Sequence, residues 1–119
     1  MKKILYVDDA SSMRKLVNLV LSKEFEITMA ENGLEGYKAI QNHTFDAIIS
    51  DINMPVMSGL EFLEKLREHP NSKFTPVLML TTEANAELKA EGKRLGATGW
   101  IVKPFDPEKL GAIINRAIG

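Results

Sequence analysis

The chain has 119 residues, of which 45% are hydrophobic and 26% charged, and its formal net charge is −1 at pH 7. This length suits one domain with a real core, and the balanced charge excludes a broad basic surface for nucleic acid or an anionic membrane. The sequence has no cysteine, which excludes disulfide bonds, thiolate metal sites and thiol nucleophiles. We therefore expect neither nucleic acid nor a membrane as a partner.

The N-terminus has lysines before apolar residues, as a signal peptide does. The apolar run ends after four residues at Asp8 and Asp9, and no later stretch approaches membrane-spanning length. We expect a cytoplasmic protein that begins naturally at Met1. Because no linker or low-complexity segment interrupts the chain, residues 1–119 are interpreted as a single domain without an output domain.

Short apolar runs rich in β-branched residues alternate with segments of helical periodicity. The runs predict strands at Ile4–Val7, Ile27–Ala30, Phe45–Ser50, Val77–Leu80 and Gly99–Val102. Several runs are apolar throughout, which is typical of parallel strands covered on both faces. Strict alternation with short connections predicts an α/β fold, with a parallel sheet, right-handed crossovers and helices on both sides.

The helices follow from apolar stripes and from residues that favour helix ends. The first helix is predicted from the stripe Met13, Leu16, Val17 and Val20, with Ser11 or Ser12 as the expected cap. The third helix carries Leu60, Leu63 and Leu66 and ends at His69-Pro70. The fifth helix follows Asp106-Pro107 and carries Leu110, Ile113, Ile114 and Ala117. The second and fourth helices are expected at roughly Gly33–Gln41 and Ala84–Leu95, and each contains a destabilising glycine, Gly36 or Gly92. Gly96 is expected to close the fourth helix in a left-handed conformation.

Polar residues follow four of the five predicted strands, at the edge where such sheets bind ligands. They are Asp8-Asp9, Asp51, Thr81-Thr82 and Lys103-Pro104. Three clustered carboxylates repel one another, and a divalent cation with oxygen ligands relieves the repulsion. Mg²⁺ suits this set because it uses one or two carboxylates and leaves positions for phosphate oxygens. An aspartate beside Mg²⁺ is a competent nucleophile toward a phosphoryl donor, with Lys103 and Thr81 as partners of the transferred group.

Each of these residues is also typical of an ordinary structural role. Asp8 and Asp9 suit a solvated loop or a helix cap, and Asp51 suits a turn before a proline. Thr81 and Lys103 are common at strand ends and surfaces. Trp100 suits a half-buried core position, Met54 and Met57 suit packing, and His43 and His69 are expected to face solvent. Only their gathering at neighbouring strand ends favours a site.

The chain resembles the receiver domains of two-component response regulators, and most closely the stand-alone chemotaxis CheY type. The resemblance covers the whole chain and rests on five ordered blocks: Ile4–Asp9 with Met13-Arg14, Asp51–Gly59, Leu80–Thr82, Gly96-Ala97 and Lys103–Phe105. It implies a flavodoxin-like, doubly wound (βα)5 fold whose five-stranded parallel sheet has the order 2-1-3-4-5. That order is taken from the resemblance, since CheY-type proteins are a known example of it.

The resemblance also implies a role for each matching residue. Asp51 would accept the phosphoryl group, Asp9 and Asp51 would bind Mg²⁺ directly with Asp8 as the other acidic residue, and Asn53 would offer its backbone carbonyl to the metal. Thr81 and Trp100 would be the switch pair, Lys103 would pair with the phosphate, and Pro104 would follow a cis peptide bond. Asn53 and Glu83 would modulate the lifetime of the phosphorylated state, and Thr82 would narrow access to the phosphate.

Trp100 departs from the family, which more often has tyrosine or phenylalanine at this position. Thr82 replaces a residue that is commonly small. The larger indole puts an inward swing of the switch aromatic in question, and its N–H needs a partner when buried.

The implied function is a signalling module, not an enzyme, that catalyses only its own phosphorylation and dephosphorylation. A histidine kinase of the chemotaxis type would be the donor, and a flagellar motor switch protein is the suggested target of the surface formed by the fourth helix, fifth strand and fifth helix. A phosphate sink for the kinase is the alternative. An aspartyl-phosphate phosphatase is disfavoured because Asp8-Asp9-Ala10 lacks the Asp-x-Asp pattern, and a flavin carrier because the first loop is acidic.

Overall fold

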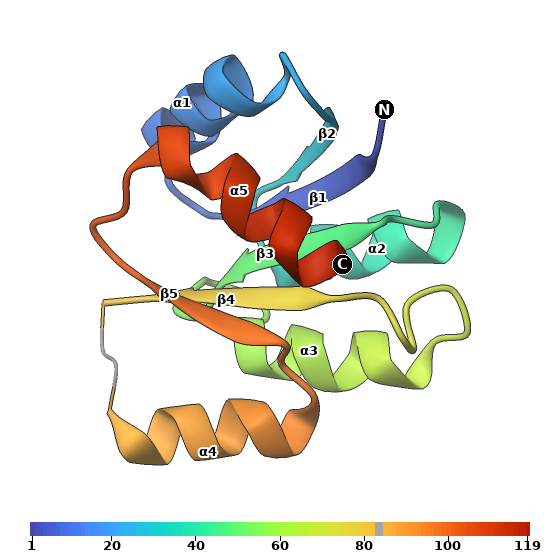
Figure 1. The fold of residues 1–119 in the computed structure, drawn as a ribbon. Helices are drawn as coiled ribbons and strands as arrows, with labels where there is room; N and C mark the ends of the chain where they lie inside the picture. The colour runs from blue at the N-terminus through green and yellow to red at the C-terminus, as the bar shows by residue number, and fades with distance from the viewer. Residues whose placement is uncertain (83–84) are drawn as a thin grey trace.

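The computed structural model describes residues 1–82 and 85–119, and five parallel strands form one sheet in the order β2-β1-β3-β4-β5 (Figure 1). The strands are β1 (Lys3–Val7), β2 (Glu26–Ala30), β3 (Ala47–Asp51), β4 (Val77–Thr81) and β5 (Gly99–Val102). β1, β3 and β4 therefore lie in the interior of the sheet, and the fold class expected from the sequence is confirmed.

Helices cover both faces of the sheet. They are α1 (Ser11–Leu21), α2 (Gly33–Asn42), α3 (Gly59–Glu68), α4 (Ala86–Leu95) and α5 (Pro107–Ile118). α1 and α5 lie on one face, and α2, α3 and α4 lie on the other (Figure 1). Within the described ranges, 1–82 and 85–119, no helix is long and apolar enough to cross a membrane.

The alternation of side chains along β1 divides the core into two layers. Ile4 and Tyr6 pack with α1 and α5, whereas Leu5 and Val7 pack with α2 and α3. All four side chains are fully buried. This burial on both faces explains why the strand is apolar throughout, and it leaves the strand ends as the place for polar chemistry.

Most helix ends have the residues that their position requires. The side chains of Asn32, Ser58, Asn85 and Asp106 each accept a hydrogen bond from a backbone N–H in the first turn of α2, α3, α4 and α5. Gly96 closes α4 with φ of 102°, as expected. The cap expected at Ser11 or Ser12 is wrong: Ala10 is the N-cap of α1 and no side chain caps it.

The structure corrects two further expectations. β3 begins at Ala47, not Phe45, because Phe45 is buried from the loop before the strand, in which Asp46 bonds to the backbone of Lys3. His69 does not face solvent: it is half-buried, its Nδ1 accepts from the N–H of Asn71, and its ring meets Tyr37 edge-on.

The apolar stripe of α1 is only partly buried, since Leu16 is 43% exposed. The start expected for the fourth helix, Ala84, lies outside the described residues, and α4 is described from Ala86. The packing roles of Met54 and Met57 are confirmed, because both contact the core beneath α2 and α3.

Candidate functional site

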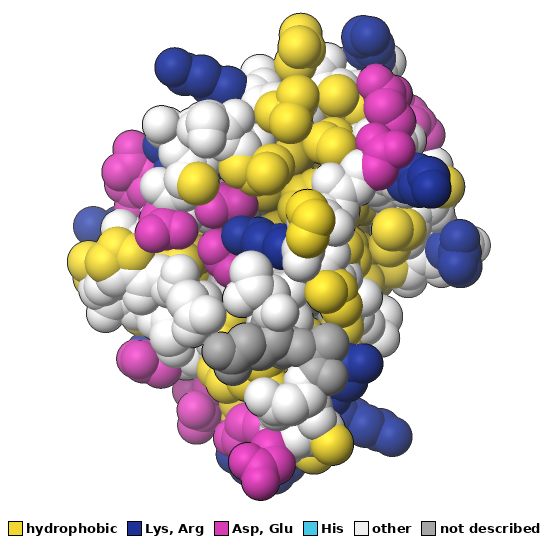
Figure 2. All heavy atoms as spheres, turned by 90° about the vertical axis from the view of Figure 1, so that its left-hand side faces the viewer, with side chains coloured by type: hydrophobic (Ala, Val, Ile, Leu, Met, Phe, Trp, Pro, Cys, Tyr) yellow, Lys and Arg dark blue, Asp and Glu magenta, His cyan; other side chains and the backbone are white. Residues whose placement is uncertain are grey.

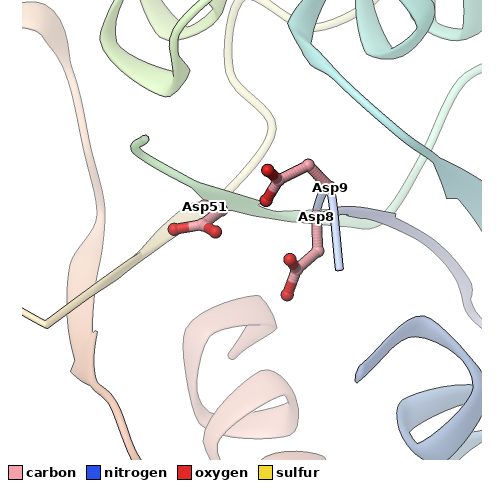
Figure 3. Close-up of side chains that lie close together, drawn as sticks. All are labelled: Asp8, Asp9 and Asp51. Atoms are coloured by element: carbon pink, nitrogen blue, oxygen red, sulfur yellow. The ribbon is translucent and has the colours of Figure 1, made fainter. Parts of the chain in front are cut away.

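The acidic side chains meet at the carboxyl edge of the sheet. One carboxylate oxygen from each of Asp8, Asp9 and Asp51 lies within 4.8 Å of the others. Figure 3 shows Asp8 and Asp9 leaving the end of β1 on opposite sides, with Asp51 beside them. Figure 2 shows acidic and basic side chains together near the middle of this face, with hydrophobic side chains around them. The gathering of strand ends expected from the parallel topology is therefore confirmed.

Asp8 is fully buried and is held on every side. Its Oδ1 accepts from the N–H of Ala10 at 3.0 Å, and its Oδ2 accepts from the hydroxyl of Tyr6 at 2.8 Å. Its backbone carbonyl accepts from Nη1 of Arg14 at 2.7 Å, and its N–H donates to the carbonyl of Ala30 at 3.1 Å. Both carboxylate oxygens of Asp8 are thus already engaged by the protein.

Asp51 lies at the end of β3 and is only 7% exposed. Its Oδ1 accepts from the N–H of Ile52 at 2.9 Å, and its Oδ2 accepts from Nζ of Lys103 at 2.9 Å. Burial raises the pKa of Asp51 above its ordinary value, although the hydrogen bond and charge of Lys103 oppose the rise. The carboxylate is therefore a buried charge, and the ammonium group of Lys103 is the cation that stabilises it.

Lys103 comes from the loop after β5 and serves two carboxylates. Its Nζ lies 2.9 Å from Oδ2 of Asp51 and 3.7 Å from Oδ2 of Asp8. Its backbone N–H donates to the carbonyl of Thr81 at 2.8 Å, which extends the β4–β5 ladder by one bond. The peptide bond between Lys103 and Pro104 is cis, as the resemblance implies.

The charges and donor types at this edge fit a divalent cation. Three carboxylates and one ammonium leave two negative charges, and all the candidate ligand atoms are oxygens. Asp9 is exposed, and Asn53 is exposed in the loop after β3. The residues present therefore fit Mg²⁺, with Asp9 as the exposed carboxylate and Asp8 and Asp51 as the buried ones.

Gly59 positions the loop that follows Asp51. The Gly59 N–H donates to the carbonyl of Ile52 at 2.8 Å, so the start of α3 folds back onto the end of β3. A Cβ on Gly59 would come within 2.0 Å of the carbonyl oxygen of Asp51. From the sequence, Gly59 was recognised only as part of a motif, and the need for a residue without a Cβ was missed. No role was predicted for Tyr6 or Arg14.

The other expected residues lie around the site at different distances. Thr81 is buried at the end of β4, next to β3, and Thr82 follows it exposed. Glu83 lies outside the described residues. Trp100 is half-buried in β5, paired with Met79 of β4, while Thr81 pairs with Val102. Thr81 and Trp100 therefore share one face of the sheet on neighbouring strands.

A groove of about 310 Å³ adjoins Trp100 between β5 and α5. Its lining includes Leu78 and Gly99 from the sheet and Ile113 and Arg116 from α5. The groove is a hydrophobic surface with a cation at its rim. It lies apart from the acidic cluster, at the opposite end of β5 from Lys103.

The strand order and the two helical layers define a flavodoxin-like (βα)5 fold. The family model of the response regulator receiver domain matches residues 4–115, and the chain belongs to that family. Receiver domains are signalling modules of two-component systems, whose general function is a phosphorylation switch, and the family binds Mg²⁺ at an acidic pocket.

Solved structures and curated relatives agree with this assignment. The chemotaxis protein CheY4 of Vibrio cholerae is 49% identical, with a TM-score of 0.94 and 98% of each chain covered. A CheY-like receiver domain protein of Methanospirillum hungatei is 29% identical, with a TM-score of 0.92 and coverage of 99% of this chain and 94% of the other. The transcriptional regulatory protein SrrA of Staphylococcus aureus is 39% identical over 109 residues, 91% of this chain but only 44% of SrrA.

Proposed function

We propose that this chain is a phosphorylation-controlled switch in which Asp51 accepts a phosphoryl group from a histidine kinase. The observation that carries the proposal is the 2.9 Å contact between Lys103 Nζ and Asp51 Oδ2 within the acidic cluster. Of the three carboxylates, Asp51 has this close cation, whereas Asp8 is enclosed and Asp9 is exposed. A transferred phosphoryl group on Asp51 would keep the ammonium as its charge partner.

Asp9, Asp51 and the backbone carbonyl of Asn53 would hold Mg²⁺, with Asp8 supporting the site from its buried position. When bound, Mg²⁺ would neutralise charge on the phosphoryl oxygens during transfer. The low solvent exposure of Asp8 and Asp51 keeps water from screening these interactions.

In the transfer step a carboxylate oxygen of Asp51 attacks the phosphorus atom of the kinase's phosphohistidine. A P–O bond forms as the P–N bond breaks, and the imidazole nitrogen keeps the bonding electron pair. Lys103 follows the new phosphoryl oxygens, and the Thr81 hydroxyl donates a hydrogen bond to one of them. Attack of water on the phosphorus later returns Asp51 as a carboxylate with release of inorganic phosphate.

The output would come from the surface formed by α4, β5 and α5. Thr81 and Trp100 share a face of the sheet, so movement of Thr81 toward the phosphoryl group changes the packing beside the indole. The groove next to Trp100, with Arg116 at its rim, would be part of the target surface. Phosphorylation then shifts the population of target-binding conformations by an amount set by the difference in affinity.

Similarity to CheY4 supports a chemotaxis role, with a chemotaxis-type kinase and a flagellar motor switch protein as partners in the cytoplasm. The identity of 49% extends over 98% of each chain. A phosphate sink uses the same chemistry and remains the alternative function. A target peptide that binds the phosphorylated form more tightly than the unphosphorylated form separates the two.

Intact mass after incubation with acetyl phosphate tests the chemistry. We expect a gain of one phosphoryl group in wild type that requires Mg²⁺ and disappears in Asp51→Ala. Asp46→Ala removes an exposed carboxylate that precedes β3, at the end of the strand opposite Asp51. It serves as the matched control and should gain the group as wild type does. No gain in wild type at saturating Mg²⁺, or an undiminished gain in Asp51→Ala, would refute the proposal.

A further inference from the structure

We propose that Tyr6 is a positioning residue of the metal site, acting through Asp8; this inference rests on the proposed function. Tyr6 lies one residue before the end of β1, an interior strand, at a position where the two-sided burial of β1 calls for a purely apolar side chain. It is fully buried, yet it carries a hydroxyl that must find a partner. That partner is Oδ2 of Asp8, at 2.8 Å.

The geometry of a strand explains how one residue reaches the other. Side chains two residues apart lie on the same face of a strand, so Tyr6 and Asp8 both leave β1 toward α1 and α5. The phenol therefore extends along the strand toward its carboxyl end and meets the first carboxylate of the acidic cluster. Tyr6 links the hydrophobic core to the site with a single hydrogen bond.

The bond fixes the direction of the Asp8 carboxylate. With Oδ1 held by the N–H of Ala10 and Oδ2 held by the Tyr6 hydroxyl, the carboxylate cannot rotate without losing a charge-assisted bond. Tyr6 thus keeps the Asp8 carboxylate oriented in a position that water does not reach.

The hydrogen bond between Tyr6 and Asp8 also affects where the Lys103 ammonium group lies between the two carboxylates. The ammonium nitrogen of Lys103 lies 2.9 Å from Oδ2 of Asp51 and 3.7 Å from Oδ2 of Asp8. Oδ2 of Asp8 already accepts a hydrogen bond from the Tyr6 hydroxyl. Without the phenol O–H, that buried oxygen would lack its close donor, and Lys103 would be drawn toward it. A positive charge would then move deeper into the acidic cluster and oppose a bound cation.

The test compares Mg²⁺ binding in wild type, Tyr6→Phe and Tyr37→Phe, followed by amide chemical shifts during titration with MgCl₂. Tyr6→Phe keeps the ring that packs in the core and removes only the hydroxyl. The chain has two tyrosines, and Tyr37 on α2 is the matched control. Removing a hydrogen-bond partner of a metal-site residue typically costs about 10- to 100-fold in metal affinity. We expect a rise of about tenfold or more in the Kd of Tyr6→Phe and no change in Tyr37→Phe.

A double-mutant cycle with Asp8→Asn shows whether Tyr6 acts through Asp8. In the Asp8→Asn background, Tyr6→Phe should change the Kd for Mg²⁺ by much less than in wild type. Unfolding of each variant in EDTA separates an effect on the metal site from an effect on the fold, and it identifies a temperature at which all variants are folded for the titrations.

The outcomes distinguish the inference from the proposed function. Absence of Mg²⁺ binding in wild type would refute the proposed metal site itself. If wild type binds Mg²⁺ and Tyr6→Phe binds it equally or more tightly, the inference about Tyr6 is wrong while the proposed function stands. An equal loss in the presence and absence of the Asp8 carboxylate would likewise overturn the inference, because the hydroxyl would then act by another route.

Discussion

The indole of Trp100 lies so close to Gly92 that a Cβ at position 92 would come within 2.2 Å of Trp100 Cζ2. Gly92 is buried in α4 and faces the indole across the gap between helix and sheet. From the sequence this glycine is only a defect in a helix, whereas the structure shows that it makes room for the largest side chain. The pair explains how this chain accommodates tryptophan at the proposed switch position.

Gly92→Ala should therefore displace Trp100. Alanine favours the helix by about 1 kcal/mol, but overpacking typically costs about 1–3 kcal/mol, so we expect a net loss of up to about 2 kcal/mol in the free energy of unfolding. Trp100 is the only tryptophan, and its fluorescence emission should shift to the red as the indole becomes exposed.

Gly111→Ala is the matched control for that experiment. A Cβ at Gly111 in α5 would approach the end of the flexible Glu24 side chain at 3.0 Å, which can move aside. This variant should keep the emission of wild type and gain up to about 1 kcal/mol in stability. Unchanged emission together with increased stability in Gly92→Ala would contradict the contact between Gly92 and Trp100.

Asp51→Asn should stabilise the protein in EDTA at neutral pH. Because burial raises the pKa of Asp51 in the folded state, the folded chain binds more protons than the unfolded chain between the two pKa values. Stability is then lost as the pH rises through that interval and stays lost at neutral pH. Asparagine carries no charge to bury, so its advantage over wild type should shrink as the pH falls toward 3.8, the ordinary pKa of this group.

Thermal unfolding between about pH 4 and pH 8 measures this effect, because that range lies above the ordinary pKa of an aspartate. Asp46→Asn, at an exposed carboxylate, is the control and should show no gain at neutral pH. Adding Mg²⁺ should raise the melting temperature of wild type more than that of Asp51→Asn. Equal or lower stability of Asp51→Asn in EDTA at neutral pH would show that the lysine contact outweighs burial.

Arg67 connects two separate segments of the chain by donating hydrogen bonds to their backbone carbonyls. Its guanidinium donates to Thr75 at 2.6 Å, to Ser72 at 2.9 Å and to Gly96 at 2.7 Å, so it joins the α3–β4 loop to the end of α4. Burial lowers the pKa of Arg67 below its ordinary value. The side chain is therefore a structural clamp on three partly buried carbonyl groups.

Arg67→Met should reduce the free energy of unfolding by about 3 kcal/mol or more, because each carbonyl left without a donor costs about 1–3 kcal/mol. Urea denaturation measures the loss. Arg94→Met removes an arginine that pairs with Glu91 on the exposed face of α4, and it should leave the urea midpoint unchanged. Similar midpoints for both variants would mean that solvent replaces the clamp.

Much of this fold is predictable because burial on both faces leaves a plain mark in the sequence. The strand at Gly99–Val102 was predicted with its observed bounds, and those beginning at Ile4 and Val77 differ by one residue at one end. The predicted start of β3 was wrong because Phe45 is as apolar as a strand residue but is buried from the loop before the strand. Periodicity reports burial and does not distinguish the two.

The contacts in the structure likewise differ in how far they could be predicted from the sequence. The gathering of Asp8, Asp51 and Lys103 follows from parallel topology, which places every carboxyl end at one edge. The clamp of Arg67 on Gly96 joins residues 29 apart and depends on loop geometry that no pattern encodes. The hydrogen bond from Tyr6 to Asp8 is an intermediate case. The spacing of the two residues puts both side chains on one face, but it does not fix the rotamers that form the bond.

Val56 is strained in the loop that joins β3 to α3. Its φ is 71°, in the left-handed region that a β-branched residue rarely adopts, and its side chain is 75% exposed, so packing does not offset the cost. Asparagine tolerates this conformation, and Val56→Asn should raise the free energy of unfolding by about 1 kcal/mol. Val56→Ala keeps a Cβ and should gain less. Urea denaturation compares the three proteins, and a Val56→Asn variant no more stable than Val56→Ala would show that this loop relieves the strain in another way.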